Sequence, residues 1–194
     1  MPKVTSGSSR VAGFARAKAS FEEDAPQLKR VRAAGAPWHA ADMSNPSVKT
    51  GGCQCGALRY VIDKPLGRPS ICHCRMCQKA FGNAFAPLVT APGLTWVRGE
   101  PRQYRSSNKV SRGFCADCGT PITYQLDGFD PEIAIATLDR PGELPPVIQV
   151  GLESKLSWFD TLAELPTRTP EDAARAAKVF SGIVSNQHAD KPDE

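Results

Sequence analysis

Short runs of β-branched, aliphatic and aromatic residues recur through the middle of the chain, and turn-forming residues separate them. The breaks include Pro-Gly, Gly-Glu-Pro and Ser-Asn steps, which are typical of turns between strands. A regular series of this kind predicts a mainly β, antiparallel domain. In the last run, Ile133, Ile135 and Thr137 alternate and are expected to share one face. The expected strands are Leu58–Ile62, Ala84–Thr90, Leu94–Arg98, Arg102–Ser106, Val110–Cys115, Pro121–Gln125 and Glu132–Leu138.

A segment near the C-terminus carries the signals of a helix. Thr169 is a suitable N-cap, and acidic residues follow Pro170 in the first turn. We therefore predict a short helix that Pro170 opens and that continues through Ala173–Val184, packing on the body or on a partner subunit. Shorter helical turns are expected after Cys74 and around Trp158–Leu162.

The composition divides the 194 residues into a leader, a body and a tail. Residues 1–45 are rich in Ala, Arg, Lys and Ser, and we expect a flexible leader there. The sequence from Met43 onward resembles a natural protein start, so the leader is predicted to be an upstream extension outside the native protein. Residues 46–168 are expected to form one folded domain, followed by a C-terminal helix and tail over residues 169–194.

The distribution of charge argues against nucleic-acid binding. Residues before Met43 carry seven Lys and Arg against four Asp and Glu, and the remainder carries 17 against 16. The body therefore has no basic stripe to follow a phosphate backbone. No apolar run reaches the length of a membrane span, and no secretory signal is evident. We predict a cytoplasmic protein without a membrane partner.

All seven cysteines fall in three tight groups. Neighbours this close in sequence are poorly placed to form disulfides with one another. In a reducing compartment, such groups indicate metal binding rather than a disulfide framework. The groups are Cys53 and Cys55; Cys72, Cys74 and Cys77; and Cys115 and Cys118.

The spacing favours a division of the cysteines between two zinc ions. The first and last groups resemble zinc-ribbon knuckles, in which an adjacent Gly lets the backbone turn beneath the metal. Together they supply the four ligands of a closed structural site. The middle group then supplies three ligands and leaves one position exchangeable. Other pairings are compatible with the sequence, but this one leaves no cysteine over.

An open site of three cysteines suits sulfur chemistry. Three thiolates leave a Zn²⁺ centre at about −1, so it acidifies water less than sites built from neutral His. A coordinating thiol is deprotonated outright, which favours formation or cleavage of a C–S bond over hydrolysis.

Two alternatives to the open site stay open at this point. One is a second structural site closed by His73 or another group. Because His73 lies between two ligands, however, its side chain is expected to point away from the metal and to pack or hydrogen-bond behind them. The other is an iron–sulfur cluster, although the spacing matches neither ferredoxin pattern well.

Three ordered motifs resemble the glutathione-dependent formaldehyde-activating enzyme family, which includes the centromere protein V group. They are Gly51–Tyr60, Cys72–Ala80 and Arg112–Thr120, and the resemblance extends from about Val48 to Pro166. It implies a Mss4-like (β-tent) fold stapled by zinc knuckles. The family's pattern implies a structural zinc at Cys53, Cys55, Cys115 and Cys118 and a catalytic zinc at Cys72, Cys74 and Cys77.

The resemblance also implies an activity. Family members of the S-(hydroxymethyl)glutathione synthase type are carbon–sulfur lyases that join glutathione and formaldehyde. We expect a small, glutathione-like thiol and formaldehyde or a related aldehyde as substrates. A non-catalytic zinc module that binds proteins or peptides is the alternative. Gln54 and Gln149 stand where the family often has His, which leaves open the particular thiol. A homo-oligomer is compatible with the sequence.

Other residues near the cysteines have a structural and a functional interpretation. Arg75, Lys79 and Arg112 are candidates for holding the carboxylates of a peptide-like thiol. The alternative is a solvated charge or a pair with Asp117. Asp139, with Arg140, is expected at a strand end. The aromatic residues expected in the core rather than in a substrate pocket are Phe81, Phe85, Trp96, Phe114 and Trp158.

Overall fold

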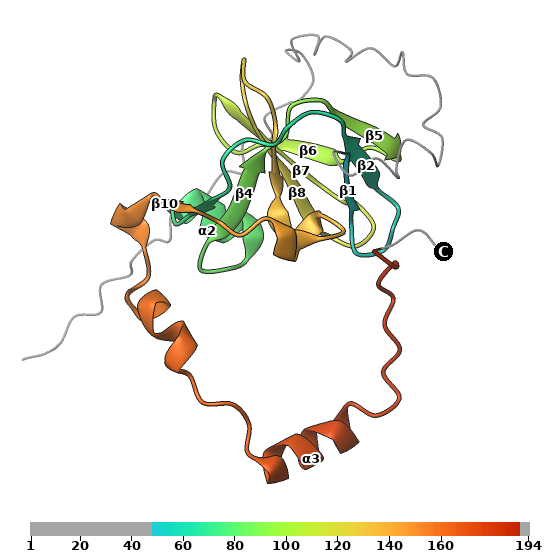
Figure 1. Ribbon diagram of the computed structural model, residues 1–194, viewed down its shortest axis with the longest axis vertical. Helices are drawn as coiled ribbons and strands as arrows, with labels where there is room; N and C mark the ends of the chain where they lie inside the picture. Colours follow the sequence, from blue (N-terminus) through green and yellow to red (C-terminus); the bar gives the residue numbers. More distant parts are fainter. Residues whose placement is uncertain (1–47, 191–194) are drawn as a thin grey trace, which may run out of the picture. The chain divides into compact units, whose positions relative to one another are not determined.

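A computed structural model describes residues 48–190 of the chain. The predicted leader, with Met43, lies outside the described residues. Within residues 48–190, ten strands form two sheets, which confirms the prediction of a mainly β fold (Figure 1). The strands are β1 Lys49–Gly52, β2 Arg59–Ile62, β3 Ser70–Cys72, β4 Ala86–Thr90, β5 Leu94–Arg98, β6 Arg102–Arg105, β7 Val110–Phe114, β8 Pro121–Leu126, β9 Glu132–Ala134 and β10 Ile148–Val150.

The pairing of the strands places distant segments side by side. The smaller sheet has the order β1-β2-β5, and the larger has the order β10-β3-β4-β9-β8-β7-β6. All strand pairs are antiparallel except β10 and β3, which run parallel. Because Val150 is the register partner of Cys72, the chain after β10 begins beside the middle cysteine group.

Side chains from both sheets share the main core. Tyr60 of β2, Ile122 of β8 and Ile133 of β9 are fully buried and belong to the same cluster. Ile133 is the register partner of Val89 on one side and of Thr123 on the other. A residue that is packed from two strands and across the core is where loss of volume costs most.

The last predicted strand is only partly correct. The chain is extended to Ala134 and then turns into a 3₁₀ helix, η1 (Ile135–Thr137). There the Thr137 hydroxyl donates to the Ala134 carbonyl (2.7 Å) and lies 2.9 Å from the Tyr60 hydroxyl. These buried hydrogen bonds satisfy polar groups of the turn that have no neighbouring strand to pair with. The alternation predicted over Ile133, Ile135 and Thr137 therefore reflects shared burial rather than one strand.

The predicted helical turns are present. Helix α2 (Arg75–Phe81) follows Cys74, and the 3₁₀ helix η4 (Ser157–Glu164) includes the predicted Trp158–Leu162. Two further 3₁₀ turns are η2 (Pro141–Glu143) and η3 (Leu152–Ser154).

The terminal helix α3 (Pro170–Val179) has the predicted N-cap, since the Thr169 hydroxyl accepts the backbone N–H of Asp172 at 3.2 Å. It ends before the predicted Val184, ahead of Gly182 with φ +83°. No residue of α3 is buried, so the expected packing on the body is not seen. No helix among residues 48–190 is long and apolar enough to cross a membrane.

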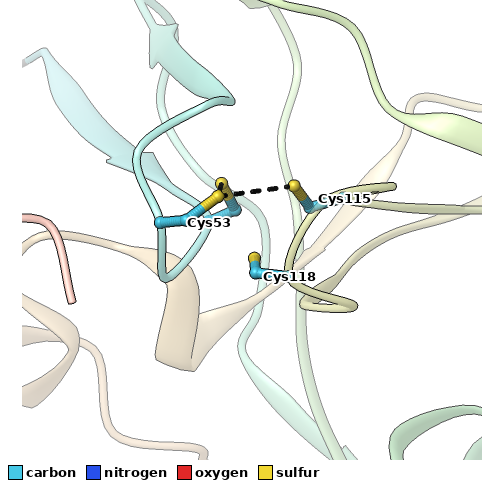
Figure 2. A group of neighbouring side chains, drawn as sticks. Cys53, Cys115 and Cys118 are labelled. Carbon is cyan, nitrogen blue, oxygen red and sulfur yellow. Dashed lines mark hydrogen bonds between the residues drawn. The ribbon is translucent and has the colours of Figure 1, made fainter. Parts of the chain in front are cut away.

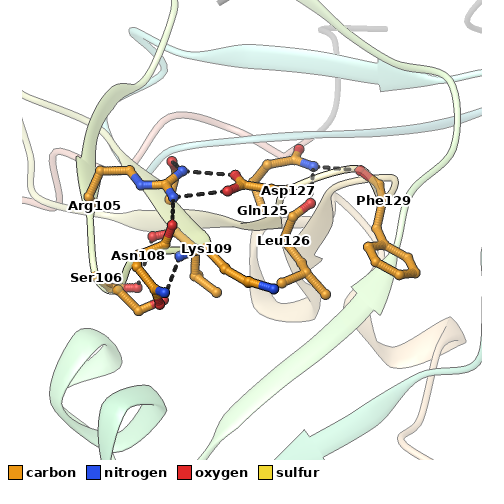
Figure 3. Close-up of polar contacts among 11 residues, drawn as sticks. Arg105, Ser106, Asn108, Lys109, Gln125, Leu126, Asp127 and Phe129 are labelled. Carbon is orange, nitrogen blue, oxygen red and sulfur yellow. Dashed lines mark hydrogen bonds and ion pairs between the residues drawn. The ribbon is translucent and has the colours of Figure 1, made fainter. Parts of the chain in front are cut away.

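An exposed ion pair joins two hairpins at the edge of the larger sheet. Arg105 at the end of β6 donates to both carboxylate oxygens of Asp127, at 2.8 and 2.9 Å, and also to the Asn108 carbonyl (Figure 3). Both side chains are about half exposed, at 48% and 54%. A pair this exposed contributes on the order of 0–1 kcal/mol.

Replacing Ile133 by Ala should lower the free energy of unfolding by about 2–5 kcal/mol, because the deletion leaves a cavity between two strands and the core. Ile183→Ala is the matched control, since Ile183 is 71% exposed and should change stability by less than about 0.5 kcal/mol. Urea unfolding of both variants measures the difference. Similar losses at the two positions would contradict this location of the core.

Candidate functional site

Four cysteines from two distant turns converge on one point. Cys53 and Cys55 lie in the turn between β1 and β2, and Cys115 and Cys118 lie in the turn between β7 and β8. Their sulfur atoms lie within 4.8 Å of one another, and Figure 2 shows the labelled side chains directed toward a common centre. We refer to these residues as the four-cysteine cluster.

The two turns have closely similar backbones. Gly56 donates its N–H to the Cys53 carbonyl at 3.1 Å, and Gly119 donates to the Cys115 carbonyl at 2.9 Å. Both glycines have a left-handed backbone, with φ of +75° and +78°, which a side chain would strain. The sequence analysis predicted this role for a glycine beside each cysteine pair. The result is a pair of tight knuckles that present two thiols each.

The geometry of this cluster fits a zinc ion. The Cys53 and Cys55 sulfurs are 3.5 Å apart, and the Cys55 and Cys115 sulfurs are 3.8 Å apart. For Zn–S bonds of about 2.3 Å, a tetrahedron has S···S edges of about 3.8 Å. None of the seven cysteines is in a disulfide. Four free thiols at this separation are the donor set of a closed zinc site.

Hydrogen bonds favour the thiolate form of Cys118, whereas burial raises the pKa of Cys115 to about 12. Partial burial alone raises the pKa of Cys118, but hydrogen bonds from Thr120 and Cys55 together outweigh it and lower that pKa to about 6. The Thr120 hydroxyl is 3.1 Å from the sulfur. The backbone N–H of Leu58 donates to the Cys53 sulfur at 3.2 Å. Such N–H donors partly offset the charge of clustered thiolates.

The three remaining cysteines meet where β3 passes into α2. Cys72 ends β3, Cys74 is the N-cap of α2, and Cys77 lies in the first turn of α2 and is buried. The Cys74 sulfur accepts the backbone N–H of Cys77 at 3.4 Å. All three sulfurs lie within 4.8 Å of one another, and within residues 48–190 no fourth His, Cys, Asp or Glu joins the group. We call this group the three-cysteine cluster.

Cys77 is the most acidic thiol in this cluster. A hydrogen bond from the Cys72 thiol and, after it, one from the Arg112 guanidinium lower the pKa of Cys77 to about 5. The same proton sharing, together with burial, raises the pKa of Cys72. Both effects favour the thiolate form of Cys77 over that of Cys72.

His73 points away from the three sulfurs, as the sequence predicted. Its ring is fully buried, stacks edge-to-face on Phe159 with centroids 4.6 Å apart, and lies 6.2 Å from the Phe85 ring. The Nε2 atom is 2.9 Å from the Gln149 side-chain oxygen. His73 thus connects the cluster to the segment after β10 rather than closing it as a fourth ligand.

The segment after β10 packs directly on the three-cysteine cluster. Gly151 has φ +69°, and a Cβ there would lie 2.8 Å from the Cys74 backbone nitrogen. The buried Gln78 amide donates to the His73 carbonyl (2.7 Å) and to the Ser154 carbonyl (2.8 Å). Sequence reasoning missed Gln78, because nothing in a local pattern signals its contact with Ser154.

The three basic residues predicted to hold substrate carboxylates lie in different environments. Arg112 is buried, at 3% exposed, and its Nη2 donates to the Cys77 sulfur at 3.3 Å rather than pairing with Asp117. Arg75 is exposed and donates to the Gln78 side chain at 2.6 Å, and Lys79 is exposed. The interpretation of Arg112 as a solvated charge is therefore wrong.

The other sequence assignments hold only in part. Asp139 lies in the bend between η1 and η2 rather than at a strand end, and it pairs with Arg59, with side chains only 8% and 11% exposed. Trp158, which was expected in the core, is 51% exposed, because η4 contains no buried residue. Beside Arg112 lies a cavity of about 250 Å³, lined in part by Phe81, Tyr104, Phe114 and Thr123. The four remaining aromatic candidates, Phe81, Phe85, Trp96 and Phe114, are half-buried.

Comparisons with known proteins show the family to which the chain belongs. A family model described as glutathione-dependent formaldehyde-activating enzyme matches residues 48–154. That range contains both cysteine clusters, and the family's fold is Mss4-like, as predicted. Among solved structures, the crystal structure of a Rhodobacter sphaeroides protein is similar, with 24% sequence identity and a TM-score of 0.42. The match covers 52% of this chain and 99% of that chain.

Replacing Gly151 by Ala should lower the free energy of unfolding by about 1–3 kcal/mol, the cost of a side chain in a left-handed conformation. The added methyl group also meets the Cys74 backbone. Gly142→Ala is the control, since a Cβ there meets nothing within 4 Å and should change stability by less than about 0.5 kcal/mol. Chemical denaturation compares the two, and equal effects would show that Gly151 is not constrained.

Proposed function

Because the chain belongs to the glutathione-dependent formaldehyde-activating enzyme family, we propose that it is a zinc-dependent carbon–sulfur lyase. It joins a small, glutathione-like thiol with formaldehyde or a related aldehyde in the manner of an S-(hydroxymethyl)glutathione synthase. The observation that supports this proposal best is the three-cysteine cluster, which gathers three sulfurs and, within residues 48–190, no fourth ligating side chain. We place the activity in a domain spanning residues 46–168.

The two clusters have different roles in this proposal. Cys53, Cys55, Cys115 and Cys118 hold a structural zinc, because four thiols complete its preferred coordination. Cys72, Cys74 and Cys77 hold the catalytic zinc and leave one position for a ligand from outside. When bound there, the ion supplies Lewis acidity that keeps an incoming thiol deprotonated.

The proposed reaction balances without any other reactant. The thiol sulfur forms a bond to the aldehyde carbon while the carbonyl π bond breaks, and its electron pair passes to oxygen. The proton that the thiol loses ends on that oxygen, giving a hydroxymethyl thioether. The reverse step breaks the same C–S bond. No redox cofactor is required, and no acid stronger than water is needed at the oxygen.

The surrounding side chains limit water on one side of the cluster. Buried Ala86 and Leu88 pack with Cys77, and Phe81 and Tyr124 lie against the same group. An apolar wall strengthens electrostatic interactions near the reacting sulfur, because little water screens them. Cys72 and Cys74 are only half-buried, so they are the two sulfurs of the cluster that a substrate can approach.

Gln149 bears on the choice of thiol. It stands where the family often has His, and it contacts the cluster indirectly, through its hydrogen bond to His73. Neither Gln149 nor Gln54 belongs to a cysteine cluster, so the exchange leaves the ligands intact. A panel of glutathione and smaller thiols therefore belongs in the assay.

Replacing Cys74 by Ser should leave the fold intact, lower the zinc content from two ions per chain to one, and reduce catalysis to the uncatalysed rate. Ser is itself a good N-cap, so α2 keeps its start. The measurement combines metal analysis with an NMR exchange assay of formaldehyde and thiol, since the condensation also proceeds without enzyme.

Cys118→Ser is the matched substitution in the other cluster. It should also remove one ion, but its main effect should be a lower unfolding temperature, because the ion joins two distant turns. Two tightly held ions in the Cys74→Ser protein would contradict the division of roles. Absence of exchange with every thiol, in a protein that holds two ions, would favour a non-catalytic zinc module.

A further inference from the structure

We propose that Arg112 is a positioning residue that supplies the positive charge needed by the three-cysteine cluster to hold a metal ion. The proposal rests on the proposed function, which assigns an ion to that cluster. It adds the residue whose positive charge offsets the negative charge of the thiolates. It concerns the metal affinity of the resting protein and does not depend on which thiol or aldehyde reacts.

The position of Arg112 is fixed from three sides. It lies in the middle of β7, where its Nε donates to the Ser106 hydroxyl at 3.2 Å and its Nη2 donates to the Cys77 sulfur at 3.3 Å. The guanidinium carbon lies 5.0 Å from the centre of the Tyr124 ring, a distance typical of a cation–π contact. These contacts hold the cation against one edge of the cluster.

Arg112 has no carboxylate partner in the part of the chain that the structure describes. The ion pairs found there involve other arginines and lysines. Its Nη1 is buried and has no hydrogen-bond partner. A guanidinium is charged at all ordinary pH values, and a buried charge is costly unless it is paired. The anion that Arg112 contacts directly is therefore the cluster, through Cys77, and the Glu132 carboxylate lies near enough to interact with both Arg112 and Cys77.

The charges of the two sides match. Three thiolates and a divalent ion carry a net charge of about −1, and one buried guanidinium cancels it. At the four-cysteine cluster, backbone N–H groups offset part of the negative charge, and Cys55 is exposed to water. The ion pairs and hydrogen bonds of the described residues place no Arg or Lys on a sulfur there. Cys77, which is as buried as Cys115, has the Arg112 guanidinium as its donor instead.

The test measures metal affinity without thiol or aldehyde. The full chain is stripped of metal under reducing conditions and titrated with Co²⁺, and the cobalt–thiolate absorption follows each site. The Cys74→Ser protein identifies the signal of the three-cysteine cluster. Arg112→Gln should weaken Co²⁺ binding at that cluster by about 10–100-fold, the usual effect of losing a partner behind a ligand. Binding at the four-cysteine cluster should not change.

Three further variants separate charge from packing. Arg112→Lys keeps the charge and should retain a large part of the Co²⁺ affinity. Arg112→Met removes the charge and should bind Co²⁺ no more tightly than Arg112→Gln. Arg105→Met removes an exposed Arg from the adjacent strand β6 and should leave both sites unchanged. Circular dichroism of each metal-loaded protein establishes that the folds compared are the same.

Unchanged Co²⁺ affinity in Arg112→Gln would overturn the proposal and would leave Arg112 as an anchor for a substrate carboxylate. An equal loss at both clusters would also overturn it, because that pattern reports a general loss of structure. Failure of the proposed function gives a different result: Arg112→Gln would still weaken one cobalt site, while the wild-type protein would show no formaldehyde exchange.

Discussion

Several thiols held within 4.8 Å of one another form a stable group only when protons or a cation neutralise the charge of their ionised forms. This requirement governs how the sheets are joined. The four-cysteine cluster connects the turn after β1 with the turn after β7, and the Cys55–Cys115 contact spans 60 residues of chain. Bringing such distant turns together costs conformational entropy, which a shared ion would offset. Two of the strands that build the core, β2 and β8, directly follow these turns in the sequence. Packing of the sheets and convergence of the ligands therefore support each other.

The two clusters meet the same electrostatic requirement in different ways. At the four-cysteine cluster, backbone N–H groups and the Thr120 hydroxyl donate to sulfur, and water reaches Cys55. At the three-cysteine cluster, Cys77 is buried and the compensating group is the Arg112 guanidinium. Dipoles spread around a cluster are suited to a metal site with a structural role. A single buried cation at one edge leaves the other edge of the cluster free, which suits a centre that must accept a ligand.

The sequence predicted what depends on local spacing and missed what depends on distant pairing. Cysteine spacing and the glycines at positions 56 and 119 are local, and the structure brings the corresponding sulfurs together. The strands rich in β-branched residues were found, whereas β3 and β10 were missed because they pair with each other across a long stretch of chain, and β1 was missed because it contains two glycines. The burial of Arg112 was not predictable, since a charged residue on a strand is usually solvated. Its partner lies 35 residues away, on another element.

The layer behind the three cysteines comes from parts of the chain that are far apart in sequence. The three ligands belong to one short segment, Cys72–Cys77, but Arg112 comes from β7, and Gln149 and Ser154 come from β10 and η3. Each of the latter contacts a ligand or its neighbour and can change without altering a ligand. The three sulfurs therefore depend on one short segment, whereas the charge and the hydrogen bonds behind them depend on how distant elements pack. Gln149 belongs to this second layer, because it reaches the cluster only through His73.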